Sequence, residues 1–334
     1  MMLTRKSRGG TRTLKAPALA AGIVIAVAAH GALSQPYPHK PVRVLVPFPA
    51  GAGVDIVARL IGQPLAELWG QPVVADNRPG AGGTIACELA AKAAPDGHTL
   101  LIGNLSTLAM APSLYQKVNY DPVRSFAPVT LVNTSANVLV VHPAVPATST
   151  QALIALAKAR PGQINYASVG SGTSPHLAAE LFKSMAGVDL VHVPYKGSPQ
   201  ALTDLLGGQT QLMFASLVAA LPHIRQGRLR ALGVTALQRA AVLPEEPTIS
   251  EAGLTGYDVA VWMGVVAPAG TPPAVIGQLN RQIAAILQVP AIRDRLSAQG
   301  LEAFTNSPAE FAAYIAAEVR KWAGIIRRAG VVAD

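Results

Sequence analysis

Short apolar runs alternate with helical patterns along most of the chain after residue 34. Apolar runs bounded by Gly, Pro or polar residues are typical of buried strands, whereas apolar residues three or four apart form one face of a helix. The predicted strands are Val42–Val46, Pro72–Ala75, Thr99–Ile102, Asn137–Val141, Ile164–Ala167, Leu190–Val193, Leu212–Phe214, Leu232–Thr235 and Val259–Val266. The predicted helices are a segment around Ile56–Ile61, which Pro64 is expected to kink or shorten, then Thr84–Ala94, Ala152–Ala159, Leu177–Met185, Ala201–Leu206, Val275–Leu287, a short piece after Pro290, and Pro308–Ala329.

Strands that are apolar on both faces and joined by helices predict an α/β fold with mostly parallel sheets covered on both sides. The number of strands favours two sheets in two lobes over one sheet. Because the C-terminal tail has helices but no strand, we expect it to pack on the first lobe. The predicted domains are residues 35–137 with 266–334 for lobe 1 and residues 138–265 for lobe 2, with a cleft at the two crossings.

The N-terminal segment, residues 1–34, has the pattern of a secretory signal peptide. Five Lys and Arg residues precede the apolar stretch Ala16–Ala29, and small residues at Ala32 and Ser34 predict cleavage before Gln35. The stretch is short for a membrane-spanning helix, and an uncleaved anchor is the alternative. The expected location is the periplasm.

Charge and cysteine content exclude several classes of function. The signal carries five basic residues and no acidic ones, so its removal lowers the formal net charge from +9 to +4. That charge is mild and forms no basic stripe with interleaved aromatic residues, so no nucleic-acid partner is expected. Cys87 is the single cysteine and cannot form an internal disulfide. Its apolar helical neighbours predict a buried structural residue rather than a catalytic thiol.

Two glycine-punctuated turns of similar build are the candidate site: PFPAGAGVD at Pro47–Asp55 and SVGSGTSPH at Ser168–His176. Each follows a predicted strand and leads into a predicted helix. Unpaired backbone N–H groups and the positive end of the helix dipole meet at such a turn and favour an anion. Two copies in two lobes predict that the lobes hold one anionic molecule between them.

The turns lack the residues of other phosphate and catalytic motifs. Ile56 stands where a dinucleotide fingerprint needs its third glycine, and neither turn has the Lys followed by Ser or Thr of a P-loop. No nucleophile elbow surrounds Ser171, and the seven His lack metal-ligand spacing. We therefore predict no enzymatic activity, no cofactor and no metal. A secreted hydrolase that uses Ser171 or Cys87 is the less favoured alternative.

Two titratable residues in these turns have two interpretations each. His176 begins the helix after the second turn and could donate a hydrogen bond to a ligand or hold the turn through its ring nitrogens. Asp55 could cap the helix after the first turn or bind an ammonium group or ordered water over the ligand. His192 and His223 are expected to be structural.

Six motifs in order resemble one family over essentially the whole chain after the signal. They are YPHKPVRVLVPFPAGAGVDIVAR (Tyr37–Arg59), NRPGAGGTIA (Asn77–Ala86), APDGHTLL (Ala94–Leu101), NYASVGSGTSPHLAAELF (Asn165–Phe182), VHVPYKGSPQALTDLLGGQ (Val191–Gln209) and LPEEPTISEAG (Leu243–Gly253). The chain resembles the Bug family, the TctC-like extracytoplasmic solute receptors of tripartite tricarboxylate transporters.

The resemblance implies a two-lobed periplasmic binding protein of the type II-like fold that closes on a small carboxylate. Di- and tricarboxylates, aromatic acids and acidic amino acids all fit this class. The implied partners are the membrane subunits of a tripartite transporter or, alternatively, a sensor kinase that reads the receptor without transport. A monomer is expected.

The family's ligand-binding residues carry over to both turns. The first turn supplies Phe48, Ala50, Gly51, Ala52 and Asp55, and the second supplies Ser168, Gly170, Gly172, Thr173 and His176. Tyr195, beside Lys196, is expected to line or support the cleft. The family usually has glycine where this chain has Ala52 and aspartate where it has Ala215, so the ligand is expected to differ from that of relatives with the acidic residue. Ser216 is the neighbouring polar residue that could compensate.

Overall fold

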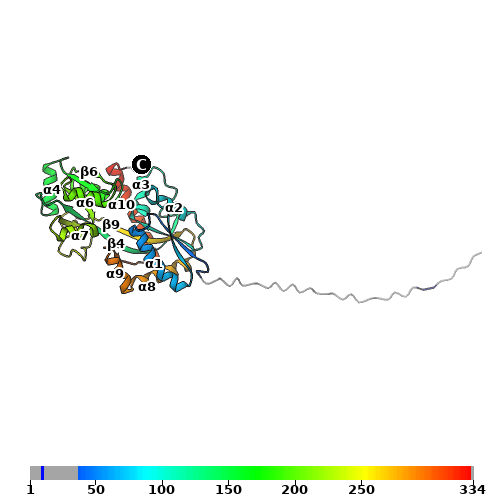
Figure 1. Cartoon of the computed structure of the whole chain (residues 1–334). Coiled ribbons are helices and arrows are strands. Elements are labelled where there is room, and N and C mark those ends of the chain that lie inside the picture. Colours follow the sequence, from blue (N-terminus) through cyan, green and yellow to red (C-terminus); the bar gives the residue numbers. More distant parts are fainter. Residues whose placement is uncertain (1–8, 11–36, 332–334) are drawn as a thin grey trace, which may run out of the picture. The chain divides into compact units, whose positions relative to one another are not determined.

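The computed structural model describes residues 9–10 and 37–331, and residues 37–331 belong to one compact unit (Figure 1). The predicted signal peptide and its cleavage before Gln35 therefore lie outside the described residues, apart from residues 9–10. The strands are β1 (Val42–Val46), β2 (Val73–Asn77), β3 (Thr99–Asn104), β4 (Phe126–Val141), β5 (Asn165–Ser168), β6 (Val191–Pro194), β7 (Leu212–Ser216), β8 (Arg230–Val234), β9 (Ala260–Pro268) and β10 (Glu302–Ala303).

Helices connect most of these strands, as the alternating pattern predicted. They are α1 (Gly53–Trp69), α2 (Thr84–Ala91), α3 (Ala111–Leu114), α4 (Thr150–Ala159), α5 (Ser174–Ala186), α6 (Ser198–Leu206), α7 (Leu217–Arg225), α8 (Pro273–Leu287), α9 (Pro290–Ser297) and α10 (Pro308–Ala329), with the short turns η1 (Ala81–Gly83) and η2 (Ser106–Met110). The α/β prediction is confirmed, and each predicted strand overlaps a strand of the structure.

The long strand β4 joins two sheets. Its first part, up to Ala136, pairs antiparallel with β9, and its second part, from Asn137, pairs antiparallel with β7 and β8. On the far sides, β2, β1 and β3 pair parallel in one sheet, and β7, β5 and β6 pair parallel in the other. The sheets are therefore mixed: the outer strands are parallel, as expected, and the central β4 and β9 run antiparallel to their neighbours.

We call the part built on β1, β2, β3, β9 and the first part of β4 the first lobe, and the part built on β5–β8 and the second part of β4 the second lobe. The pairing switch at Ala136 and Asn137 supports the predicted first crossing at 137/138. The return from the second lobe to the first, expected at 265/266, stays a prediction, and β9 pairs with strands of the first lobe from Ala260 onward. We propose that the return crossing lies just before Ala260.

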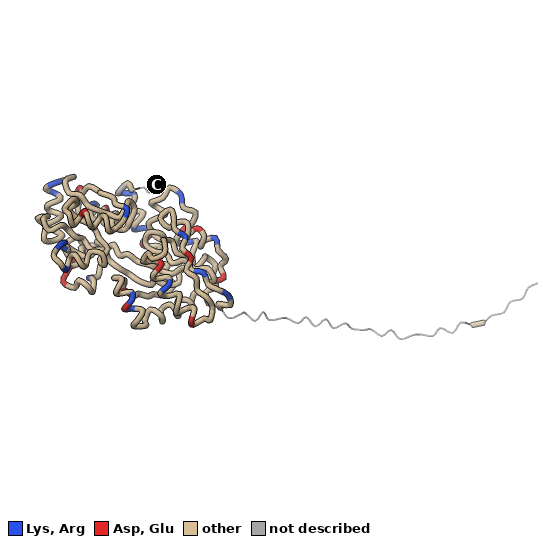
Figure 2. Tube along the Cα trace, viewed as in Figure 1, with Lys and Arg blue, Asp and Glu red and all other residues tan. Residues whose placement is uncertain are grey.

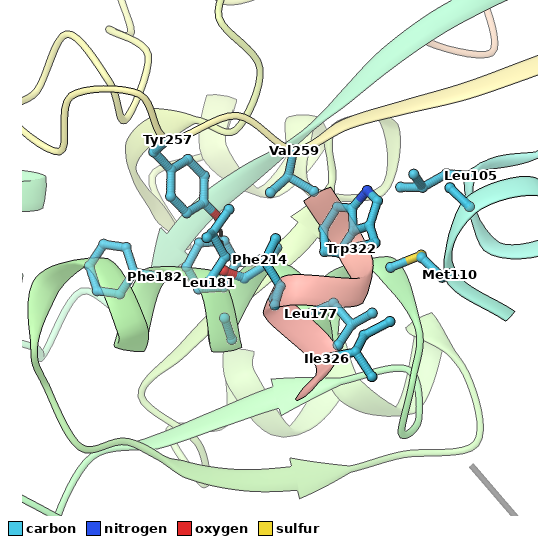
Figure 3. Packing of buried hydrophobic residues seen from close by; sticks show 14 of the residues in the cluster. Leu105, Met110, Leu177, Leu181, Phe182, Phe214, Tyr257, Val259, Trp322 and Ile326 are labelled. Atoms are coloured by element: carbon cyan, nitrogen blue, oxygen red, sulfur yellow. Dashed lines mark hydrogen bonds between the residues drawn. The ribbon is translucent and has the colours of Figure 1, made fainter. Parts of the chain in front are cut away.

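The C-terminal helices cover both lobes. Leu279 and Ile283 of α8 belong to the apolar core of the first lobe, which agrees with the expected position of the tail. The longer α10 also reaches the second lobe, since Trp322 and Ile326 lie in a second core together with Leu177 of α5 (Figure 3). This second core extends from η2 to the second-lobe sheet, so α10 helps to fix the two lobes to each other.

Local signals explain how α10 begins and ends, whereas packing decides how far α1 extends. Ser307 and Glu310 form a capping box at the start of α10, and Gly330 ends the helix with a left-handed φ of 63°. The predicted shortening of α1 at Pro64 was wrong, because α1 continues through Pro64 to Trp69 and ends at Gly70. Packing of its apolar face, including Val57, Ile61 and Leu65, outweighs the loss of one helical hydrogen bond.

Beside the short elements α3, β10, η1 and η2, two longer stretches of regular structure were not predicted from the sequence. The first part of β4 contains the polar run from Asn133 to Asn137, which obscured the strand pattern. Helix α7 is short and contains Pro222, so its pattern was too weak to separate from a loop. Cys87 is buried, as expected, and burial raises the pKa of its thiol to about 12. A thiol of this kind is inert.

A pair of Gly→Ala substitutions tests how α10 is fixed to the sheet. A methyl group on Gly264 of β9 would overlap the buried ring of Phe311 in α10, so Gly264→Ala should lower the free energy of unfolding by about 1–3 kcal/mol. The same change at Gly277, inside α8 with space beside it, should raise it by roughly 0.5–1 kcal/mol. Urea denaturation measures both, and a neutral Gly264→Ala would contradict the packing described.

Candidate functional site

A cavity of about 300 Å³ lies where β4 passes from one lobe to the other, and we call it the interlobe cavity. Its lining comes from both lobes and includes both glycine-rich segments. The lining residues are Gly53, Ile56, Ser135, Ala136, Asn137, Val169, Ser174, Pro175, Ser198, Ser216, Leu217, Val218, Val261, Met263, Gln299, Gly300 and Leu301. This volume is at the lower end of the range for small-molecule sites.

Four helices begin at the interlobe cavity. Gly53, Ser174, Ser198 and Leu217 are the first residues of α1, α5, α6 and α7, and all four line it. The N–H groups in the first turn of a helix have no acceptor within the helix, and the helix dipole adds partial positive charge there. The cavity therefore collects backbone donors from both lobes.

Charged side chains do not line the interlobe cavity among the residues that the structure describes. Lys, Arg, Asp and Glu are instead scattered along the described trace (Figure 2). Any anion in this cavity would be held by backbone N–H groups and neutral side chains, which need no buried counter-ion.

The first glycine-rich turn is ordered by Asp55, the third residue of α1. Its buried carboxylate accepts the Gly51 N–H at 2.9 Å, the side-chain amide of Asn77 at 2.9 Å and Arg59 Nε at 3.0 Å. Burial alone would raise the pKa of Asp55, but the hydrogen bonds from Arg59, Gly51 and Asn77 outweigh it and hold this pKa below its usual value. Asp55 is therefore an anion that is already satisfied inside the turn.

The second turn repeats this arrangement with a different side chain. His176, the third residue of α5, accepts the Gly172 N–H on Nδ1 at 2.9 Å. In both turns the acceptor lies four residues after a glycine in the left-handed region, with φ of 83° at Gly51 and 74° at Gly172. The next residue in each turn donates its N–H to the carbonyl three positions earlier. The similarity seen in the sequence therefore extends to the hydrogen bonds.

His176 belongs to a stack of rings behind the second turn. Its ring lies 4.0 Å from that of His192 at an angle of 4°, and His192 stacks in turn on Tyr166 at 4.9 Å. His192 Nε2 lies 2.6 Å from the hydroxyl of Ser168. Burial, followed by the neighbouring His192, lowers the pKa of His176 to about 4. His176 is therefore neutral at pH 7, as its role as an acceptor requires.

The predicted residues of the first turn lie next to the interlobe cavity. Ala50 and Gly51 are exposed, and Ala52 is the half-buried residue that directly precedes Gly53. Phe48 is half-buried, and its carbonyl accepts a hydrogen bond from Asn77. None of these residues is among those that line the cavity, although Gly53 and Ile56 of the following helix are.

Of the predicted second-lobe residues, one lines the interlobe cavity and the others support the turn or the strands behind it. Ser216 lines the interlobe cavity, and Ala215, at the departure from the family pattern, is buried in β7. Ser168, Gly170 and Thr173 bond one another inside the turn. Tyr195 donates its hydroxyl to Asp204 of α6 at 2.8 Å and its N–H to the carbonyl of Ser168, so it links α6 to the end of β5.

Several lining residues were missed from the sequence. Gly53, Ser174 and Ser198 stand at helix starts. The change from a strand or turn to a helical pattern is the sequence signal that could have identified them. Asn137 lies in a predicted strand, and its side-chain amide donates to the Ser174 hydroxyl at 3.0 Å. The segment 299–301 carries no local signal, because tertiary packing of Gly300 against Val218 brings it to the cavity.

A pH titration tests the role of His176. Its folded pKa of about 4 lies below the usual 6.5, so its contribution to stability is complete above pH 6.5 and is lost as the pH falls toward 4. The free energy of unfolding should fall by up to roughly 1.4 kcal/mol per pH unit in that window from this residue. His176→Gln, which keeps an acceptor for Gly172, should flatten the dependence of the unfolding free energy on pH. The dependence that remains is the smaller contribution of His192, whose pKa is also lowered by burial. An unchanged slope would contradict the assignment.

Residues 9–10 and 37–331 contain neither a metal-ligand cluster nor a helix suited to a membrane. No three His, Cys, Asp or Glu side chains are grouped as metal ligands. Over the same part of the chain, no helix combines the length and apolarity needed to cross a bilayer.

Known proteins match this chain over most of its length. The model of the tripartite tricarboxylate transporter family receptor, TctC, matches residues 57–331. Protein BugT of Bordetella pertussis is 39% identical over 312 residues, which cover 92% of this chain and 96% of that protein. A UPF0065 protein from the tcbD-tcbE intergenic region of Pseudomonas sp. strain P51 is 40% identical over 310 residues and 92% of each chain.

Two related proteins have been solved with small carboxylates, one with adipate and one with malate. Rpa4515 of R. palustris with adipate has a TM-score of 0.75 and 38% identity, covering 89% of this chain and 99% of that one. MatC of Rhodopseudomonas palustris with bound malate has a TM-score of 0.72 and 34% identity, covering 87% and 100%. These relatives are substrate-binding receptors rather than enzymes. From this fold and these matches, the chain belongs to the TctC family, the extracytoplasmic receptors of tripartite tricarboxylate transporters.

Proposed function

We propose that this protein is a periplasmic receptor that captures a small carboxylate in the interlobe cavity and delivers it to the membrane subunits of a tripartite transporter. The observation that carries the proposal is the convergence of four helix N-termini on one cavity that both lobes line. Family membership and the adipate and malate of the two relatives support a carboxylate as the ligand.

The carboxylate is held by donors that are already in place. Backbone N–H groups at the starts of α1, α5, α6 and α7 supply charge-assisted hydrogen bonds, which are stronger than neutral ones. Serine hydroxyls at Ser174, Ser198 and Ser216 add side-chain donors. The Ser174 oxygen accepts from Asn137, which leaves its own O–H free to donate to a ligand.

Most residues of the two turns shape this donor set instead of contacting the ligand through their side chains. Asp55 and His176 each accept the N–H of a left-handed glycine, which fixes the path of the backbone into α1 and α5. Both side chains are buried and internally paired. In this proposal Ser216 is the member of the predicted set that reaches the ligand through its side chain.

Ligand binding is coupled to the relative position of the lobes. Gly53, Met263 and Leu301 line the interlobe cavity from the first lobe, while Ser174 and Ser216 line it from the second. A ligand that contacts both sides stabilises the closed arrangement by its differential affinity. In this proposal the membrane partner recognises that closed, monomeric form. The signal peptide predicted at residues 1–34 directs the chain to the periplasm.

The substitution Ser198→Asp separates ligand binding from folding. An aspartate at the first position of α6 suits the helix dipole, so the melting temperature should stay the same or rise slightly. The same negative charge at the cavity should repel a carboxylate and weaken its binding at least about tenfold. Isothermal titration with adipate and malate measures the affinity.

The matched control is Ser198→Asn, which has nearly the same size as the aspartate but no charge. It should bind the carboxylate within a few-fold of the unmodified protein. If both variants bind equally well, the ligand does not lie at the start of α6 and the proposed site is wrong. If no organic acid binds the unmodified protein, the proposed function is wrong.

A further inference from the structure

Resting on the proposed function, we infer that the interlobe cavity selects carboxylates with an unsubstituted hydrocarbon body over hydroxylated or tricarboxylic ones. The basis is the placement of polar and apolar side chains in the lining. The polar side chains Ser174, Ser198 and Ser216 stand at helix starts of the second lobe, whereas four apolar side chains of the first lobe lie together in the lining: Ile56, Val261, Met263 and Leu301. We call this set the apolar face.

The polar side chains of the cavity are arranged for a carboxylate and leave little for other groups. Ser174, Ser198 and Ser216 stand at the starts of α5, α6 and α7, where the backbone donors also are. The Asn137 amide is bonded to Ser174, and the Ser135 hydroxyl lies 3.4 Å from the carbonyl of Val261, to which it donates. The remaining polar lining residue, Gln299, is exposed at the rim.

The apolar face offers no partner to a hydroxyl group on the ligand. A ligand hydroxyl that contacts Ile56, Val261, Met263 or Leu301 gives up its hydrogen bonds to water and gains none. An unmade hydrogen bond at a dry surface is costly, while a methylene at the same position gains from burial. The apolar face therefore favours a plain carbon body.

A third carboxylate meets the same obstacle more strongly. No cationic side chain lines the interlobe cavity among the described residues. The charged residues Arg239, Asp258 and Glu302 line an adjoining cavity of about 260 Å³, which shares four lining residues with the interlobe cavity. An extra negative charge held against the apolar face would be unpaired, which excludes tricarboxylates more strictly than hydroxylated acids.

Matched ligand pairs test this selectivity by isothermal titration calorimetry on the unmodified protein. The pairs butyrate and 3-hydroxybutyrate, succinate and malate, and adipate and galactarate keep the carbon chain and the carboxylates and change only the hydroxyls. For every pair that binds, the plain acid should bind about tenfold more tightly per hydroxyl, and citrate should bind more weakly than any bound dicarboxylate. Equal or tighter binding of the hydroxylated member would overturn the inference but leave the carboxylate receptor intact. Absence of binding by every acid would overturn the proposed function and the inference with it.

Substitutions on the apolar face test its role directly. Val261→Thr keeps the shape and adds a hydroxyl, so the preference for succinate over malate should shrink at least about threefold. Met263→Gln, whose side chain has a similar length, should reduce the preference for succinate over malate in the same way. It replaces Val261→Thr as the test if that variant fails to fold. Val191→Thr makes the first change on exposed β6, away from the cavity, and should leave the ratio unchanged. A preference that survives both cavity variants unchanged would show that the apolar face does not set it.

Discussion

The first-turn N–H groups of four helices are the constraint around which this site is built. These donors have no acceptor inside their own helices, and α1, α5, α6 and α7 all begin at residues that line one cavity. Each strand-to-helix turn that supplies them must keep its shape without a ligand. In the first and second turns, an acceptor at the third helical position does this by taking the N–H of a left-handed glycine. In the proposed function, the donors nearest the cavity hold the carboxylate.

Asp55 and His176 both accept a glycine N–H and hold a turn in shape, but they do so with different chemistry. Asp55 is a carboxylate that three donors keep ionised, whereas His176 is a neutral ring whose burial against His192 disfavours its cationic form. Only the unprotonated Nδ1 of His176 can accept the Gly172 N–H, so burial of the ring and the shape of the turn depend on each other. The second turn is therefore sensitive to acid in the range where histidine titrates, while the first is paired to Arg59 and is not.

The position of the helix starts follows from β4 and α10. The strand β4 is continuous across both sheets, so the cavity forms where its partners change from β9 to β7 and β8. Helix α10 adds a core that extends from η2 to α5, with Trp322 buried at its centre (Figure 3). Close contacts that only glycine allows, Gly264 on Phe311 and Gly300 on Val218, bring distant segments together.

The sequence by itself determined most strands and helices, the two matching turns and the family, because each of these is encoded by local periodicity or by a short motif. It identified Ser216 as a lining residue but placed the binding groups mainly inside the turns, whose donors and acceptors are partly used by one another. Tertiary structure decided that α6 and α7 also begin at the cavity and that Val261, Met263 and Leu301 form its apolar face. These features depend on strand order and on contacts between residues more than a hundred positions apart, which no local pattern records.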